Sequence, residues 1–140
     1  MKAELIAPCG MNCGFCSAYL AYTHGLEKRK GTSHCTGCRA RNKECSFIKK
    51  RCPSGLSKNL IQFCYECDKF PCENLVKISS RYEKNYNYNF IEALNFIRDK
   101  GMAAFLKREK KRWKCPDCGG VLCVHNGKCY RCQDVKSWRG

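Results

Sequence analysis

Four cysteines near the C-terminus have the spacing of a metal site. Cys115 and Cys118 form one Cys-x-x-Cys pair, and Cys129 and Cys132 form a second pair after ten intervening residues. Two such pairs joined by a short hairpin bring four thiolates around one ion, as in a zinc ribbon. Because four protein ligands leave no open position for water, this spacing predicts a structural zinc site and not a catalytic one.

Residues 9–72 hold a larger set of cysteines, for which the same chemistry is expected. Three Cys-x-x-Cys pairs lie in this segment, and such short loops let two thiolates reach one ion with little strain. We therefore predict metal ligation by all ten of its cysteines, which are Cys9, Cys13, Cys16, Cys35, Cys38, Cys45, Cys52, Cys64, Cys67 and Cys72. With the C-terminal site they would hold two or three zinc ions, and their grouping into sites is left open.

Iron-sulfur clusters are the alternative occupant of this segment, since they also accept four thiolates. The triplet Cys9, Cys13 and Cys16, with Phe15 before its last cysteine, has the spacing used by radical S-adenosylmethionine enzymes. Those enzymes need a partial barrel of alternating strands and helices, and whole barrels take roughly 250 residues. The chain has 140 residues and no such alternation, which disfavours that enzyme class. Zinc is preferred because Cys-x-x-Cys turns with glycine favour it.

The cysteine content bears on the cellular compartment. Fifteen cysteines in 140 residues indicate either a secreted disulfide scaffold or a metal protein in a reducing compartment. Residues 1–10 contain only a short apolar run, unlike a signal peptide, and no later run approaches a membrane span. We therefore expect a cytoplasmic protein without membrane contact, whose cysteines are ligands and not cystines.

The chain is strongly basic. Its formal net charge is +15, and three four-thiolate zinc sites would still leave it at about +9. Basic residues gather at 28–30, 39–51 and 107–114. Such patches bind nucleic-acid phosphates or a protein partner, or they are solvated surface that balances the anionic metal centres. No serine, histidine and carboxylate grouping and no phosphate loop is recognisable, so no small-molecule substrate is identified and an enzyme is the least favoured class.

A short helix is expected to position the first cysteines. Apolar side chains at residues 15–22 have helical spacing, and His24 with the following glycine marks the end. A helix here places Cys13 and Cys16 at its positive end. The helix dipole is then expected to lower the pKa of both thiols.

The later cysteines of the segment lie on turns and on a second short helix. Between Cys35 and Cys38 a glycine lets backbone N–H groups point at a sulfur. The neighbouring His34 is expected to face solvent and is a less favoured ligand. Apolar residues within 56–63 predict a helix that delivers Cys64 to its site.

Two adjacent helices are predicted in the second half. Asn89 and Glu92 form a capping box that begins the first helix, and Gly101 ends it. A second helix follows over residues 102–113, with one apolar side and many basic residues. These helices are expected to supply the conventional apolar core.

Four further expectations concern the regions around these helices. A helix with Pro71 in its first turn is predicted to run through Ile78. Residues 81–88 are interpreted as a polar linker whose tyrosines cover the core. In the C-terminal hairpin, Cys123 is expected to be a buried small hydrophobe, and His125 a surface residue.

The order of these motifs resembles an uncharacterised family of small, cysteine-rich prokaryotic proteins, DUF3795, common in anaerobes. The resemblance covers nearly the whole chain and extends into a C-terminal zinc-ribbon-like tail. It implies cysteine-bound metal and no known reaction. Its motifs are Cys9-Gly-x-x-Cys13-x-x-Cys16, Cys35-x-Gly-Cys38, Cys64-x-x-Cys67-x-x-Phe70-Pro71-Cys72-Glu73, and the 101–113 helix before Cys115-Pro-x-Cys118-Gly-Gly.

Together these patterns predict a small metal-scaffolded α+β protein with an irregular and helical cysteine-rich N-terminal part, two helices and a short zinc-ribbon β-hairpin. The expected divisions are a metal-binding domain at 1–80, a linker and helical pair at 81–113, and a zinc ribbon at 114–140. Few large apolar side chains lie within 9–72, so that segment is expected to need metal for its fold. The preferred function is a non-enzymatic zinc-binding module that docks a protein or nucleic acid. The alternative is an iron-sulfur electron-transfer or redox protein.

Overall fold

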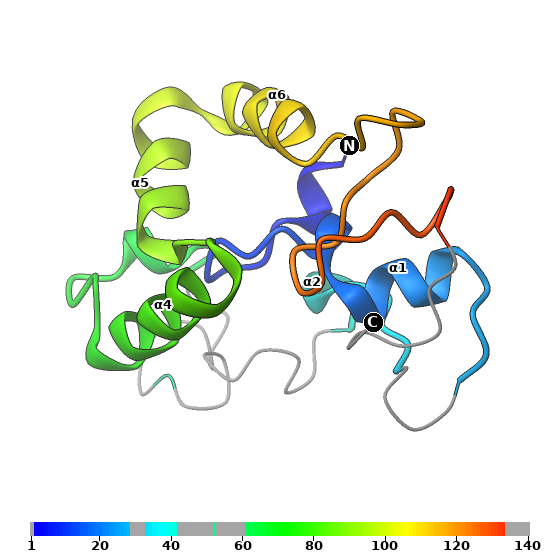
Figure 1. Cartoon of the computed structure of the whole chain (residues 1–140). Helices are drawn as coiled ribbons and strands as arrows, with labels where there is room; N and C mark the ends of the chain where they lie inside the picture. Colours follow the sequence, from blue (N-terminus) through cyan, green and yellow to red (C-terminus); the bar gives the residue numbers. More distant parts are fainter. Residues whose placement is uncertain (1, 29–32, 42–51, 53–60, 134–140) are drawn as a thin grey trace.

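The computed structural model describes residues 2–28, 33–41, 52 and 61–133. Short helical elements form the N-terminal half, and longer helices follow residue 72 (Figure 1). Within these ranges no β-strand forms. The elements are η1 (Ala3–Leu5), η2 (Cys13–Phe15), α1 (Ser17–Thr23), α2 (Cys38–Arg41), η3 (Cys64–Glu66), α4 (Glu73–Tyr86), α5 (Phe90–Lys100) and α6 (Met102–Arg112).

The predicted C-terminal β-hairpin is not confirmed. In the described part of the chain its pairing is limited to isolated antiparallel bridges, between Lys114 and Val121 and between Leu122 and Cys129. The predicted small size and helical elements are confirmed, but the described residues are mostly helical and the β part of the predicted α+β class is not confirmed. The predicted division of the chain into domains at residues 80 and 113 stays a prediction. No helix among the described residues has both the length and the apolar character needed to cross a membrane.

Local signals set α5 and α6 as the sequence predicts. The side chain of Asn89 caps α5 by accepting a hydrogen bond from the backbone N–H of Glu92 at 2.9 Å. Gly101 separates the two helices with a φ of 91°, a conformation that favours glycine because it lacks a Cβ atom. Both predicted ends of α5 and the predicted start of α6 are therefore confirmed, and α6 ends at Arg112, one residue before the predicted end.

Helix α4 corrects two predictions. It begins at Glu73 with Cys72 as its N-cap, so Pro71 precedes the helix and does not lie in its first turn. It continues to Tyr86, so most of the predicted 81–88 linker is helical. Tyr88 does cover the core as expected, since its side chain is buried and its hydroxyl donates to the carbonyl oxygen of Gly10 at 2.7 Å.

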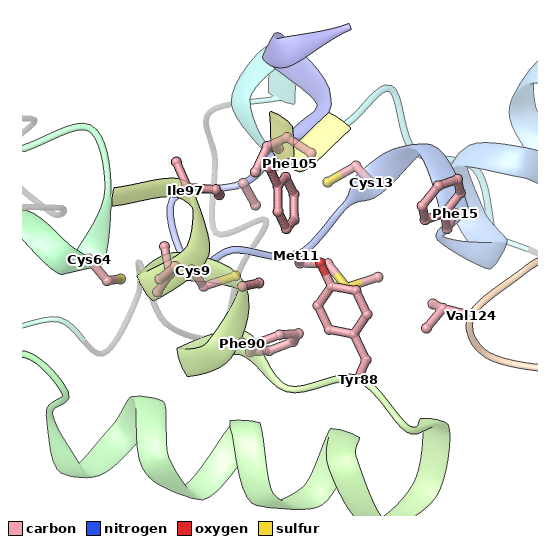
Figure 2. Packing of buried hydrophobic residues seen from close by; sticks show 14 of the residues in the cluster. Cys9, Met11, Cys13, Phe15, Cys64, Tyr88, Phe90, Ile97, Phe105 and Val124 are labelled. Atoms are coloured by element: carbon pink, nitrogen blue, oxygen red, sulfur yellow. The ribbon is translucent and has the colours of Figure 1, made fainter. Parts of the chain in front are cut away.

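The apolar core is shared between the cysteine-rich half and the helices. The N-terminal segment passes into the space that α4, α5 and α6 enclose (Figure 1). Ile6, Met11 and Phe15 are buried in one cluster with Leu94 and Phe105, and Figure 2 shows this packing around Met11. The prediction that the two helices supply the conventional core is therefore only partly right, because the N-terminal segment fills the centre.

Part of the predicted 56–63 helix lies outside the described residues, which resume at Ile61. Residues 61–63 are not helical, and the short helix η3 begins at Cys64. Cys45 also lies outside the described residues.

Candidate metal centre

Four C-terminal cysteines converge as their spacing predicts. The sulfur atoms of Cys115, Cys118, Cys129 and Cys132 all lie within 4.8 Å of one another. The Sγ atoms of Cys118 and Cys129 are 3.5 Å apart, and those of Cys115 and Cys132 are 3.7 Å apart. Tetrahedral zinc with bonds of about 2.3 Å requires sulfur separations of about 3.8 Å. The group could therefore hold a metal ion with little movement.

The first pair is shaped by a tight turn at Gly119 and Gly120. The backbone N–H of Gly119 donates to the carbonyl of Cys115 at 2.9 Å, and the N–H of Gly120 donates to the Cys118 sulfur at 3.4 Å. A Cβ atom at Gly120 would lie 3.2 Å from the sulfur of Cys118 and 3.3 Å from that of Cys129. Glycine at this position therefore lets the backbone approach both sulfurs closely.

The second pair is brought back by a turn at Gly127. The N–H of Gly127 donates to the carbonyl of Cys123 at 2.8 Å, and the N–H of Cys123 donates to the carbonyl of Lys128 at 2.9 Å. Gly127 has a φ of 69°, in the left-handed region that favours glycine. This closed turn returns Cys129 to Cys118.

The four thiols differ in how readily they ionise. Burial opposes ionisation of Cys129, but the N–H groups of Cys132 and Arg131 and the thiol of Cys118 together lower its pKa to about 7. Contact with Cys118 raises the pKa of Cys132 to about 12. Neighbouring thiolates repel one another, whereas a divalent cation would hold all of them deprotonated. The donor set and its electrostatics thus fit a thiophilic metal ion.

Two further residues between the cysteine pairs, Cys123 and His125, differ in how well they agree with the prediction. Cys123 is fully buried and is not part of the four-sulfur group, as predicted. His125 is half-buried, so its assignment to the surface is wrong. Its Nδ1 accepts from the backbone N–H of Ser17, and its Nε2 lies 3.1 Å from the hydroxyl of Tyr82. His125 therefore connects the C-terminal cysteine segment to the N-terminal half.

The first N-terminal cysteines follow the predicted helix only in part. Helix α1 ends at His24 as expected. The thiol and the backbone N–H of Cys38, with the charge of Arg39, lower the pKa of Cys13 to about 7 against the effect of its burial. Burial raises the pKa of Cys16 to about 11, so the predicted lowering is wrong for Cys16. Its desolvation outweighs the backbone hydrogen bonds at the start of α1.

A second neighbourhood surrounds Cys64. Burial has the largest effect and raises the pKa of Cys64. The negative charges of four other cysteines raise it further: Cys9, Cys72, Cys52 and Cys67. The backbone N–H of Cys64 donates to the carbonyl of Pro8 at 2.9 Å, which holds it next to Cys9. Among the described residues, however, only the C-terminal group brings three or more ligand atoms within 4.8 Å. Ligation by the ten N-terminal cysteines stays a prediction.

His34 has another role than the sequence suggests. It is half-buried, and its Nε2 lies 2.7 Å from the carbonyl oxygen of Leu26. Since the carbonyl can only accept, Nε2 carries a proton and is not available to a metal in this arrangement. The expectation that His34 faces solvent is therefore only partly right.

Arg39 connects separate segments of the N-terminal half, a role that its sequence position does not reveal. Its Nε donates to the carbonyl of Ile6 at 2.6 Å, and one terminal nitrogen donates to the carbonyl of Gln62 at 2.8 Å. Its guanidinium also lies 4.5 Å from the centre of the Phe63 ring. In the sequence Arg39 is one base in a basic run, so no local signal distinguishes it.

One comparison with known proteins gives a match. A family model described as "Protein of unknown function (DUF3795)" matches residues 5–77. No curated protein and no solved structure matches the chain. The match covers more than half of the chain and includes all ten N-terminal cysteines. The chain therefore belongs to this family of proteins of unknown function, DUF3795.

Proposed function

We propose that the chain is a non-enzymatic zinc-binding protein that docks nucleic acid beside its C-terminal cysteine site. The observation behind this proposal is a groove of about 310 Å³ between α6 and the first cysteine turn. Exposed lysines and a few small or apolar residues line it: Lys107, Lys110, Lys111, Lys114, Phe15, Gly119, Gly120 and Val121.

The basic residues of α6 separate into two functional sets. Arg108 forms an ion pair with Glu92, and Arg112 donates to the carbonyl of Asn87, so both arginines hold α6 to neighbouring parts of the fold. The four lysines line the groove instead: Lys107, Lys110 and Lys111 lie on α6, and Lys114 follows its end. None of them forms an ion pair with an acidic side chain of the described residues. Their charges are thus free to meet phosphates.

Metal binding would support this surface directly. The N–H of Leu122 donates to the carbonyl of Trp113 at 2.8 Å, and Lys114 pairs with Val121. These contacts attach the cysteine turn to the end of α6. Gly119 and Gly120 belong to both the turn and the groove. A zinc ion that fixes the turn would therefore fix one wall of the groove.

Zinc is the proposed metal because the four C-terminal sulfurs lie close enough together to share one tetrahedral ion. Metal analysis after anaerobic purification tests this choice. Zinc without iron or acid-labile sulfide is the expected result. Iron with sulfide, together with a broad visible absorption, would instead favour the iron-sulfur electron-transfer class.

Binding of the zinc-loaded chain to a fluorescent single-stranded oligonucleotide tests the docking surface. We expect the logarithm of affinity to fall with the logarithm of salt concentration, with a slope of about −0.7 for each phosphate contact. Replacing the four groove lysines with alanine is expected to weaken binding and to reduce the slope. Chelation of the metal is expected to weaken binding as well.

The matched control removes the same charge elsewhere. Lys69, Lys77, Lys84 and Lys100 are exposed lysines that do not line the groove. Equal losses of affinity in the control and groove variants would contradict a specific docking surface, because binding would then depend only on general charge attraction. A salt slope near zero would exclude nucleic acid and leave a protein partner.

A further inference from the structure

Two Cys-x-x-Cys turns of the N-terminal half face each other. The backbone N–H of Cys38 donates to the sulfur of Cys13 at 3.5 Å, although 25 residues separate them. The N–H of Cys16 donates to the carbonyl of Cys13 at 3.1 Å, which closes the first turn. One member of each pair is therefore in direct contact with the other pair.

A second contact places Cys35 beside the helix that begins after Cys16. The N–H of Cys35 donates to the carbonyl of Ala18 at 3.2 Å, so Cys35 lies beside the first turn of α1. Cys16 is the N-cap of that helix. Burial has the largest effect on the pKa of Cys16, followed by local backbone hydrogen bonds. The charges of Cys13 and Cys35 also raise this pKa and so favour the protonated thiol. All four cysteines thus belong to one neighbourhood.

The local backbone around this group matches that of the C-terminal site. The N–H of Gly37 donates to the sulfur of Cys35 at 3.4 Å, just as the N–H of Gly120 donates to that of Cys118. Gly37 has a φ of 108°, which favours glycine. N–H groups directed at sulfur stabilise the thiolate, the form that binds metal.

Cys9 lies with a different set of cysteines. The charge of Cys9 acts on Cys64. The backbone N–H of Cys64 donates a hydrogen bond to the carbonyl of Pro8, which directly precedes Cys9. In Figure 2 Cys9 and Cys64 lie on one side of the core, apart from Cys13. The structure therefore separates Cys9 from the Cys13 and Cys16 turn, although the sequence alone would group them as a triplet.

We propose that Cys13, Cys16, Cys35 and Cys38 form a second four-thiolate metal site, which excludes Cys9. This inference deepens the proposed metal-binding function and rests on it. In the described residues, only the C-terminal group has all its sulfurs within 4.8 Å of one another. The sulfurs of the proposed second group are more widely spaced. Binding of one ion therefore requires the two turns to bring their sulfurs closer together. The charges of Cys9, Cys13 and Cys38 all act on Arg39, which therefore offsets part of the negative charge of this half.

Differential alkylation of the full-length, zinc-loaded chain tests the grouping. The reduced protein is exposed to N-ethylmaleimide while zinc is withdrawn stepwise by a chelator, and each cysteine is followed by peptide mass spectrometry. We expect the four proposed ligands to become reactive together, with release of one zinc ion. The C-terminal four should respond at a separate step, with release of another ion.

Two outcomes overturn the inference. One is protection of Cys9 together with Cys13 and Cys16 while Cys35 and Cys38 react freely. The other is unprotected N-terminal cysteines while the C-terminal four stay protected, which would leave the proposed function intact. Absence of protection anywhere would instead contradict the metal-binding function itself.

Paired variants give a second measurement. Cys35→Ser combined with Cys38→Ser is expected to lower the bound zinc by one ion per chain. Cys123→Ala, which alters a buried cysteine outside the C-terminal group, should leave the zinc content unchanged. An unchanged content in the double variant contradicts the proposal; if that variant fails to fold, the alkylation result on the unmodified chain decides.

Discussion

The backbone N–H of Ser17 donates a hydrogen bond to Nδ1 of His125 at 3.2 Å, although 108 residues separate them. A backbone N–H can only donate, so Nδ1 accepts and Nε2 carries the proton of a neutral ring. Nε2 then donates to the hydroxyl of Tyr82 on α4. The C-terminal cysteine segment, α1 and α4 are thus joined at one imidazole, whose pKa is lowered by burial.

This arrangement predicts a loss of stability in mild acid. The folded pKa of His125 lies below its ordinary value of about 6.5, so the unfolded chain binds the proton more readily. The free energy of unfolding should therefore fall as the pH decreases below about 6.5. Urea unfolding between pH 8 and pH 6, with zinc retention measured in parallel, checks this.

His125→Asn should remove much of that pH dependence, because asparagine can still accept from Ser17 and does not titrate. His24→Asn is the matched control, since His24 is exposed at the end of α1. Its pH dependence should equal that of the unmodified chain. The same pH dependence in His125→Asn would show that another group is responsible.

Gly120→Ala should weaken metal binding at the C-terminal site. The added methyl group would lie 3.2 Å from one ligand sulfur and 3.3 Å from another, which forces them apart. We expect zinc affinity to fall about tenfold or more, or about 1.4 kcal/mol, as measured by competition with a chromophoric chelator. Gly127→Ala is the control, because its Cβ has open space although its φ is 69°; it should cost mainly folding stability. Equal zinc affinities in the two variants would refute the crowding argument.

Tyr88→Phe should destabilise the fold without affecting metal directly. The Tyr88 hydroxyl is buried and donates to the carbonyl of Gly10, so its removal leaves a buried acceptor unpaired. We expect a loss of about 1–3 kcal/mol in the free energy of unfolding, measured in urea. Tyr22→Phe, at a half-exposed ring on α1, should change it by less than about 0.5 kcal/mol. Similar losses in both variants would argue against a specific role for the hydrogen bond.

Removal of metal should affect the N-terminal half most strongly. Residues 9–72 have few large apolar side chains besides cysteine, and the longer helices lie after this segment. After chelation we expect amide hydrogen exchange to lose protection there while α5 and α6 retain more of theirs, with a loss of helical circular dichroism. Continued protection of residues 9–72 would show that the shared core around Ile6 and Phe15 suffices.

The sequence by itself determined the features that depend on near neighbours. Asn89 and Gly101 fix the boundaries of α5 because capping and left-handed backbone are local properties. The C-terminal cysteines were likewise predictable, since two short turns close together in the chain bring their sulfurs together. The family match over residues 5–77 agrees with the resemblance that the N-terminal cysteine motifs suggested, but it does not extend to the predicted C-terminal zinc-ribbon-like tail.

Only the tertiary structure decided which distant residues meet. Cys9 lies near Cys64 and Cys13 near Cys38, although spacing along the chain groups Cys9 with Cys13. His125 and Arg39 look like surface residues in the sequence, but contacts to Ser17 and Ile6 give them positions between segments. Burial and charge depend on partners far along the chain, and local spacing does not encode those partners.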